Sequence, residues 1–259
     1  MIKENELLFK RMNLDVWDKY KGKGVTIVVL DDAEPPREWD NVETPVDNHK
    51  SSKTGHKASV CSVIREIAPE VRIIALNYKG GMKAAVDWAL EHQNEIVNIS
   101  IGGAIRAHDA VLPLENTNIL VIAAAGNTSD GYAPEDHKRL DYPANFPWTM
   151  GIGAAEYNKN LDRDVVAGYS KWGEQLHALA YTGIYLRTSY EDRVTSFIGT
   201  SSSAPVATGL LARYIGFRRE NNLSELTKQE KFDFVRDNCD DILDNGWDKK
   251  SGYGVFKLP

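Results

Sequence analysis

The sequence is short of cysteine, with two in 259 residues. Cys61 and Cys239 lie far apart, and one such pair does not make the disulfide framework of a small secreted domain. Cys61 also sits in an apolar run at residues 58–64, where a buried free thiol is the ordinary expectation. We therefore expect the two cysteines to stay unpaired.

Apolar runs long enough to cross a membrane are missing as well. No segment approaches the roughly 18–20 consecutive apolar residues of a transmembrane helix. Residues 1–10 are charged and too short in apolar length for a secretory signal peptide. If Met1 is the native start, the sequence predicts a cytoplasmic protein without a propeptide domain.

Clustered charge of one sign is also missing. The formal net charge is −6, and the basic group at Arg213, Arg218 and Arg219 is typical of a solvated helix face. Neither a nucleic acid nor a membrane is expected as a partner, because both favour a clustered basic surface. Repeats and long linkers are absent too, so residues 1–259 are expected to form one domain, with residues 1–20 as an N-terminal extension. The oligomeric state stays open.

What the sequence does contain is an alternation of apolar strands and amphipathic helices. Strands are expected at residues 25–30, 71–76, 96–101 and 119–125, and helices at 57–66, 82–90 and 204–218. This order predicts a three-layer α/β/α fold with a mostly parallel central sheet. Ligands of such sheets bind at the carboxyl ends of the strands, so polar residues there are candidates for a site.

Four residues at such positions are candidates for catalysis. Asp31 directly follows the first strand, although a turn-forming aspartate is the alternative. His56 follows a loop-like stretch and opens a helix, and Asn127 ends the strand at 119–125. Ser201 lies where a loop becomes a long apolar helix, whose free N–H groups suit an oxyanion; an ordinary N-cap is the alternative.

The motifs around these residues resemble those of the subtilisin-like serine proteases, nearly end to end. They are Gly-Val-Thr-Ile-Val-Val-Leu-Asp at 24–31, Gly-His at 55–56, Asn-Ile-Ser-Ile-Gly-Gly at 98–103, Ala-Ala-Ala-Gly-Asn at 123–127 and Gly-Thr-Ser-Ser-Ser-Ala-Pro at 199–205. The order Asp, His, Ser is the subtilisin order and differs from that of chymotrypsin-like and α/β-hydrolase triads. The resemblance implies a subtilisin-like fold and a serine endopeptidase that acts on proteins or peptides.

The resemblance also implies a role for each residue. Ser201 would attack the scissile carbonyl, His56 would carry the proton, and Asp31 would hold the imidazole. The side chain of Asn127 and the backbone N–H of Ser201 would bind the oxyanion. Two segments would bind the substrate main chain, namely Ser100, Ile101 and Gly102, and Ala125 and Gly126.

The sequence departs from the family pattern beside two of these residues. Asp32 follows Asp31, where the family has Ser or Thr, and Lys57 replaces a glycine after His56. We expect Lys57 to point into solvent, because a cation directed inward would oppose the imidazolium. The excursion that carries the family's high-affinity calcium site is missing before Pro69, so no cofactor is expected, although a weak calcium site stays open.

Asp141 precedes Tyr142-Pro143, where the family places the base of the pocket for the side chain before the cut. A carboxylate there would favour lysine or arginine through a charge-assisted pair. The alternative is that the loop at 128–140 shifts the register and leaves Asp141 in solvent.

Other functions stay in view. A catalytically silent protein of the same fold that binds peptides is the main alternative, because the flanks of Asp31 and His56 are altered. An α/β-hydrolase or a metalloprotease would want Gly-x-Ser-x-Gly or His-Glu-x-x-His, and the sequence has neither. Residues 7–20 are amphipathic and either cover the active site as a lid or pack on the body of the protein.

Overall fold

The computed structural model describes residues 2–32, 40–44, 55–77, 82–92, 95–103, 109–128, 138–187 and 194–259. Its α-helices in these ranges are α1 (Glu6–Arg11), α2 (His56–Ile67), α3 (Met82–His92), α4 (Thr200–Glu220) and α5 (Lys228–Asp237), with 3-10 turns at Lys3–Asn5 and Asp109–Leu114. The strands are β1 (Thr26–Asp31), β2 (Val42–Glu43), β3 (Arg72–Asn77), β4 (Ile96–Ile99), β5 (Leu120–Ala124), β6 (Met150–Asn158), β7 (Arg163–Val166), β8 (Leu176–Tyr181), β9 (Ile184–Arg187), β10 (Val194–Phe197), β11 (Cys239–Asp240) and β12 (Val255–Phe256).

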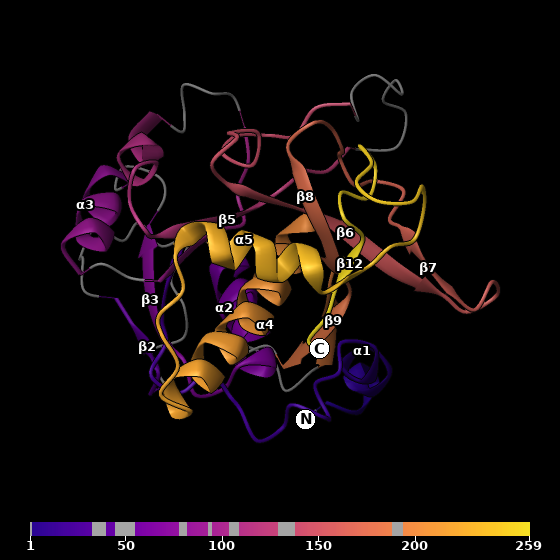
Figure 1. The fold of residues 1–259 in the computed structure, drawn as a ribbon, viewed down its shortest axis with the longest axis horizontal. Helices are drawn as coiled ribbons and strands as arrows, with labels where there is room; N and C mark the ends of the chain where they lie inside the picture. Colours follow the sequence, from indigo (N-terminus) through magenta and orange to yellow (C-terminus); the bar gives the residue numbers. More distant parts are fainter. Residues whose placement is uncertain are drawn as a thin grey trace.

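A twisted central sheet organises the molecule (Figure 1). Its strand order is β11-β12-β8-β6-β5-β4-β1-β3-β2, with β7 paired to β6, and a separate hairpin joins β9 to β10. The pairs along β12-β8-β6-β5-β4-β1-β3-β2 are parallel, while β7 and β11 run antiparallel to their neighbours. Near-continuous apolar runs form these strands because both faces of the sheet are covered. The predicted parallel sheet is confirmed.

The helices lie on the two faces of this sheet. β1 stands between β3 and β4, so the connections β1–α2–β3 and β3–α3–β4 run in opposite directions across it. Right-handed crossovers therefore put α2 and α3 on opposite faces, and α4 packs beside α2 (Figure 1). The result is the predicted three-layer α/β/α arrangement. The connection that follows β1 leads to β3 on one side, and the connection that follows β4 leads to β5 on the other side. The carboxyl ends of β1 and β4 therefore lie at a topological switch point, where ligands of such sheets bind.

The N-terminal segment packs on the body of the protein, at the end where the two termini meet (Figure 1). Phe9, Met12 and Leu14 are buried, and the carbonyl oxygen of Met12 accepts a hydrogen bond of 3.2 Å from the backbone N–H of Leu258. Arg11 forms an ion pair of 2.8 Å with Asp164. These contacts favour the packing alternative over a lid.

One expectation about the long helix is wrong. Arg213 is not on a solvated helix face, since it is 4% exposed and its guanidinium donates to the backbone carbonyls of Ile67 and Trp17. It ties α4 to the end of α2 and to the N-terminal segment. Burial lowers the pKa of Arg213 to about 10.

Both cysteines are free, and Cys61 is fully buried, as its apolar run predicts. Across the described parts of the chain, no helix is both long and apolar enough to cross a membrane.

Candidate active site

Asp31 and His56 meet at the carboxyl end of β1. Asp31 is the last residue of that strand and is completely buried, while His56 is the first residue of α2. The Nδ1 atom of His56 lies 2.8 Å and 2.9 Å from the two carboxylate oxygens of Asp31. The other face of the ring contacts Phe197 edge-on, with centroids 5.4 Å apart. The carboxylate thus fixes the ring and leaves Nε2 as the free nitrogen for a proton transfer.

The electrostatics of this pair suit a base. Burial pulls the pKa of His56 down, but the hydrogen bond and charge of Asp31, together with the charge of Asp32, outweigh it and raise the pKa above its ordinary value. Burial raises the pKa of Asp31, against the hydrogen bond and charge of His56 and against the charge of Lys57. The backbone N–H of Asp32 also donates to Asp31 at 2.6 Å, so this neighbour holds the carboxylate through its main chain.

Asn127 and Ser201 come together through Thr200. The Oδ1 atom of Asn127 accepts from the backbone N–H of Thr200 at 2.9 Å and from its hydroxyl at 3.2 Å. That hydroxyl in turn accepts from the N–H of Gly126 at 3.1 Å. Two donors at Oδ1 fix the amide, so its NH₂ group is directed to the other side. Ser201 is the second residue of α4, where a backbone N–H has no acceptor inside the helix.

The hydroxyl of Ser201 has a different partner from the one a triad requires. It donates to the backbone carbonyl of Ser100 at 2.9 Å, so among the described residues its hydrogen bond does not go to His56. Ser100 directly follows β4, and its own hydroxyl accepts from Asn98 at 3.0 Å. In a triad, this hydroxyl would have to turn from the carbonyl of Ser100 toward His56.

The segments that follow β4 and β5 lie on either side of the Asp141 side chain, and we call this place the slot. Ser100, Ile101 and Gly102 form one side, and Ala125 and Gly126 form the other. The backbone N–H of Asp141 donates to the carbonyl oxygen of Ala125 at 2.9 Å.

The side chain of Asp141 fills this slot. A Cβ atom added to Gly102 would lie 2.6 Å from Cβ of Asp141, and one added to Gly126 would lie 2.2 Å from its Oδ2. Both positions thus require glycine. Asp141 thus lies between Gly102 and Gly126 rather than in open solvent.

Lys171 meets Asp141 in this slot, which the sequence does not reveal. Its Nζ atom lies 2.8 Å from Oδ1 of Asp141, and its backbone N–H donates to the carbonyl oxygen of Gly126 at 3.0 Å. The side chains of Lys171 and Asp141 are 20% and 26% exposed. The carboxylate of Asp141 is therefore already paired with the ammonium group of Lys171, and both side chains are partly exposed to water.

The expectation that Lys57 points into solvent is wrong. Its side chain is fully buried, and its ammonium group donates to Oδ1 of Asn77. Helix α2 explains the direction, because its buried face includes Lys57 together with Ala58, Val60 and Cys61, and this face turns toward the sheet. The ammonium group of Lys57 finds a polar acceptor there, the side chain of Asn77 at the end of β3.

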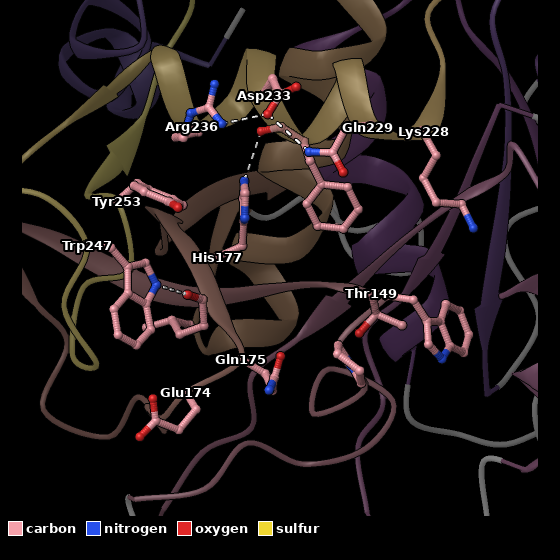
Figure 2. Close-up of a pocket in the computed structure, with 14 residues that line it drawn as sticks. Thr149, Glu174, Gln175, His177, Lys228, Gln229, Asp233, Arg236, Trp247 and Tyr253 are labelled. Carbon is pink, nitrogen blue, oxygen red and sulfur yellow. Dashed lines mark hydrogen bonds and ion pairs between the residues drawn. The ribbon is translucent and has the colours of Figure 1, made fainter. Parts of the chain in front are cut away.

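A second hollow lies at the amino ends of β6 and β8, below α5 (Figure 2). His177 donates through Nε2 to the carbonyl oxygen of Phe232 at 3.1 Å, and Asp233 accepts from Arg236 at 2.6 Å. Burial lowers the pKa of His177 to about 4, so this imidazole is neutral. The residues that line the hollow include neither serine nor cysteine. In the described parts of the chain, no group of three or more His, Cys, Asp or Glu side chains is placed to hold a metal ion.

Comparison with known proteins agrees with this geometry. The model of the Subtilase family matches residues 22–254. The chain belongs to the subtilase family. This membership places it among serine peptidases of the subtilisin type.

The curated relatives are distant in sequence, but they match most of this chain. The minor extracellular protease Epr of Bacillus subtilis is 24% identical over 91% of this chain, and the match spans 38% of that protein. The major intracellular serine protease of the same organism is 23% identical over 84% of this chain and 77% of its own length.

Solved structures share the fold over nearly the whole chain. A lanthipeptide protease superimposes with a TM-score of 0.77 at 19% identity, covering 99% of this chain and 95% of its own. The PatG macrocyclase, solved in complex with a peptide, gives 0.72 at 17% identity, covering 96% and 95%.

Proposed function

We propose that this subtilase is a serine endopeptidase whose triad is Ser201, His56 and Asp31. The observation that carries the proposal is the contact of His56 Nδ1 with both oxygens of the buried Asp31, at 2.8 Å and 2.9 Å. That contact fixes the tautomer in which Nε2 is the base, and it stabilises the imidazolium that forms when Ser201 loses its proton. Ser201 Oγ attacks the carbonyl carbon, and His56 then donates the proton to the leaving amine.

The oxyanion is bound by two donors on neighbouring elements. Thr200 holds Asn127 by its Oδ1 atom, which supports the assignment of its NH₂ group as the side-chain donor. The N–H of Ser201, in the first turn of α4, is the second donor, and the helix terminus adds a favourable potential. Both groups are fixed before the substrate arrives, so their reorganisation costs little.

The substrate main chain pairs with the segment after β4, in the manner of an added strand. The carbonyl of Ser100 faces this path and accepts a hydrogen bond from Ser201 Oγ in the structure. A substrate N–H that takes over this carbonyl releases the hydroxyl, which then turns to His56. Substrate binding thus completes the triad.

Specificity comes from the slot that holds Asp141. A lysine or arginine before the cut reaches the carboxylate by taking the place of Lys171, whose side chain is 20% exposed. The exchange replaces one charge-assisted pair by another and releases the ammonium group of Lys171 into water. Peptide profiling that shows no preference for lysine or arginine would end this part of the proposal.

The test of the proposed activity is the intact mass of the protein after a fluorophosphonate probe. The wild type should gain one adduct, and the Ser201→Ala variant should gain none, because the adduct forms only on an activated serine. Ser202→Ala is a matched control, since it removes the neighbouring hydroxyl from the same helical turn. No adduct on folded wild-type protein would favour a catalytically silent protein that binds peptides.

A further inference from the structure

Lys57 is an unusual residue to find inside a protein. Its side chain is 0% exposed, whereas lysine is almost never fully buried unless it is paired. It follows His56 directly in α2, and its backbone N–H donates to the carbonyl oxygen of Asp32 at 3.3 Å. The residue is therefore held on both its main chain and its side chain beside the triad.

The sheet register shows where the ammonium group lies. Lys57 Nζ donates to Oδ1 of Asn77, and Asn77 is the direct neighbour of Asp31 in the parallel pairing of β3 with β1. Both residues end their strands at the same edge of the sheet. The cation is thus anchored on the residue beside the buried carboxylate. Burial raises the pKa of Asp31, and the charge of Lys57 opposes this rise together with the hydrogen bond and charge of His56 and the backbone N–H of Asp32.

A buried carboxylate needs such a charge at one particular stage. In the resting enzyme His56 must be neutral to act as a base, so Asp31 then has no charged partner in the triad. An isolated buried carboxylate would take up a proton instead. The other ionisable groups near Asp31 do not supply a buried cation: Asp32 is an anion, Cys61 has its pKa raised to about 12 by burial, and Arg65 is half-buried farther along α2.

We propose that Lys57 is a positioning residue whose buried charge keeps Asp31 ionised while His56 is neutral. The inference rests on the proposed triad. The buried charge has a second consequence. It opposes the imidazolium form of His56 and so lowers the pKa at which the pair of Asp31 and His56 takes up a proton. The acid limit of activity therefore lies at a lower pH than it would without Lys57.

The first test compares the pH dependence of kcat/KM in four variants with that of the wild type. Activity requires neutral His56, so it is lost as the pH falls through the pKa of the pair. Lys57→Met and Lys57→Gln should both move this acid limb to higher pH by about one unit, the size expected for one nearby charge. Lys57→Arg should keep it in place. Lys83→Met removes an exposed lysine, paired with Asp87 on α3, and should leave the limb unchanged.

A second test does not need activity. In the Ser201→Ala protein, NMR can follow the ring of His56 and the Nζ atom of Lys57 in the same titration. Lys57 should stay charged from about pH 5 to about pH 9, through the range in which histidine titrates. The pKa of His56 should rise in the Lys57→Gln variant.

Each outcome decides the proposal. A neutral Lys57 at the midpoint of the His56 titration overturns it without any Lys57 variant having to fold. Unchanged acid limbs in active Met and Gln variants overturn it as well. If the wild type itself never reacts with the fluorophosphonate probe, the proposed activity fails, while the NMR titration still reports on Lys57 and His56.

Discussion

Two lysines lie near two aspartates at this site: Lys57 near Asp31 inside the protein, and Lys171 against Asp141 near its surface. Lys57 and Asp31 are both fully buried, and Asn77 anchors the ammonium group. Lys171 and Asp141 lie 2.8 Å apart, with side chains 20% and 26% exposed. The same two charges are therefore used in two very different surroundings.

The difference in burial separates the two roles. Charges inside the protein act strongly on their neighbours, because little water screens them, and nothing from outside can replace them. A pair that water reaches is weak, and a ligand with a similar charge can exchange with one partner. The buried lysine thus suits a fixed field at the triad, and the exposed lysine suits a place that a substrate takes over.

The largest effect should come from the buried aspartate. Asp31→Asn keeps the shape but supplies the wrong hydrogen-bond partner for the tautomer of His56, and kcat should fall by about 10⁴-fold. Asp141→Asn is the matched control and should leave kcat on a peptide with a neutral side chain before the cut nearly unchanged. Steady-state kinetics with a chromogenic peptide measures both. A loss of less than tenfold in Asp31→Asn would contradict the assigned triad.

The sequence predicts the part of the site that depends on strand ends and motifs. Asp31, Asn127 and Ser201 lie at the end of β1, after β5 and in the first turn of α4, because apolar runs mark these strands and this helix. The four predicted strands match β1, β3, β4 and β5 to within about two residues for the same reason, whereas β6 and β8 are not predicted. The short-range sequence pattern is enough, since each of these residues lies within three residues of an end of its element.

The sequence does not predict the two lysine contacts. The direction of Lys57 depends on how α2 is rotated against the sheet and on a polar acceptor, Asn77, that lies 20 residues farther on. Lys171 reaches Asp141 across 30 residues, from the loop before β8. Opposition to the imidazolium favours solvent for Lys57, yet the hydrogen bond to Asn77 holds the side chain inside the protein.

The next largest effect should appear in stability. Lys57→Met removes the hydrogen bond of a charged group to Asn77 and should lower the free energy of unfolding by about 1.5–3 kcal/mol. Lys171→Met removes a partly exposed partner and should lower it by about 1 kcal/mol or less. Urea unfolding in the Ser201→Ala background, which prevents self-cleavage, measures both. Equal losses would show that the two pairs do not differ in the way that their burial indicates.

The third effect concerns substrate choice alone. Asp141→Asn removes the carboxylate and leaves Lys171 to repel a basic side chain. Since a hydrogen bond to a charged group contributes about 1.5–3 kcal/mol, kcat/KM for a peptide with arginine before the cut should fall about 10- to 100-fold. The matched peptide with a neutral residue there should be cut as before. A preference for arginine that survives this variant would remove Asp141 from the specificity slot.

Lys171 allows the same comparison to be sharpened with salt. If a basic substrate residue must displace Lys171, Lys171→Met removes the competitor and should raise kcat/KM for the arginine peptide about tenfold, or roughly 1.4 kcal/mol.

At about 1 M salt the Debye length falls to roughly 3 Å, so the preference for arginine should weaken. The acid limb set by Asp31, His56 and Lys57 should move much less, because buried charges are screened less than exposed ones. If salt changed the acid limb as much as the preference for arginine, water would have to reach Lys57 as it reaches Lys171.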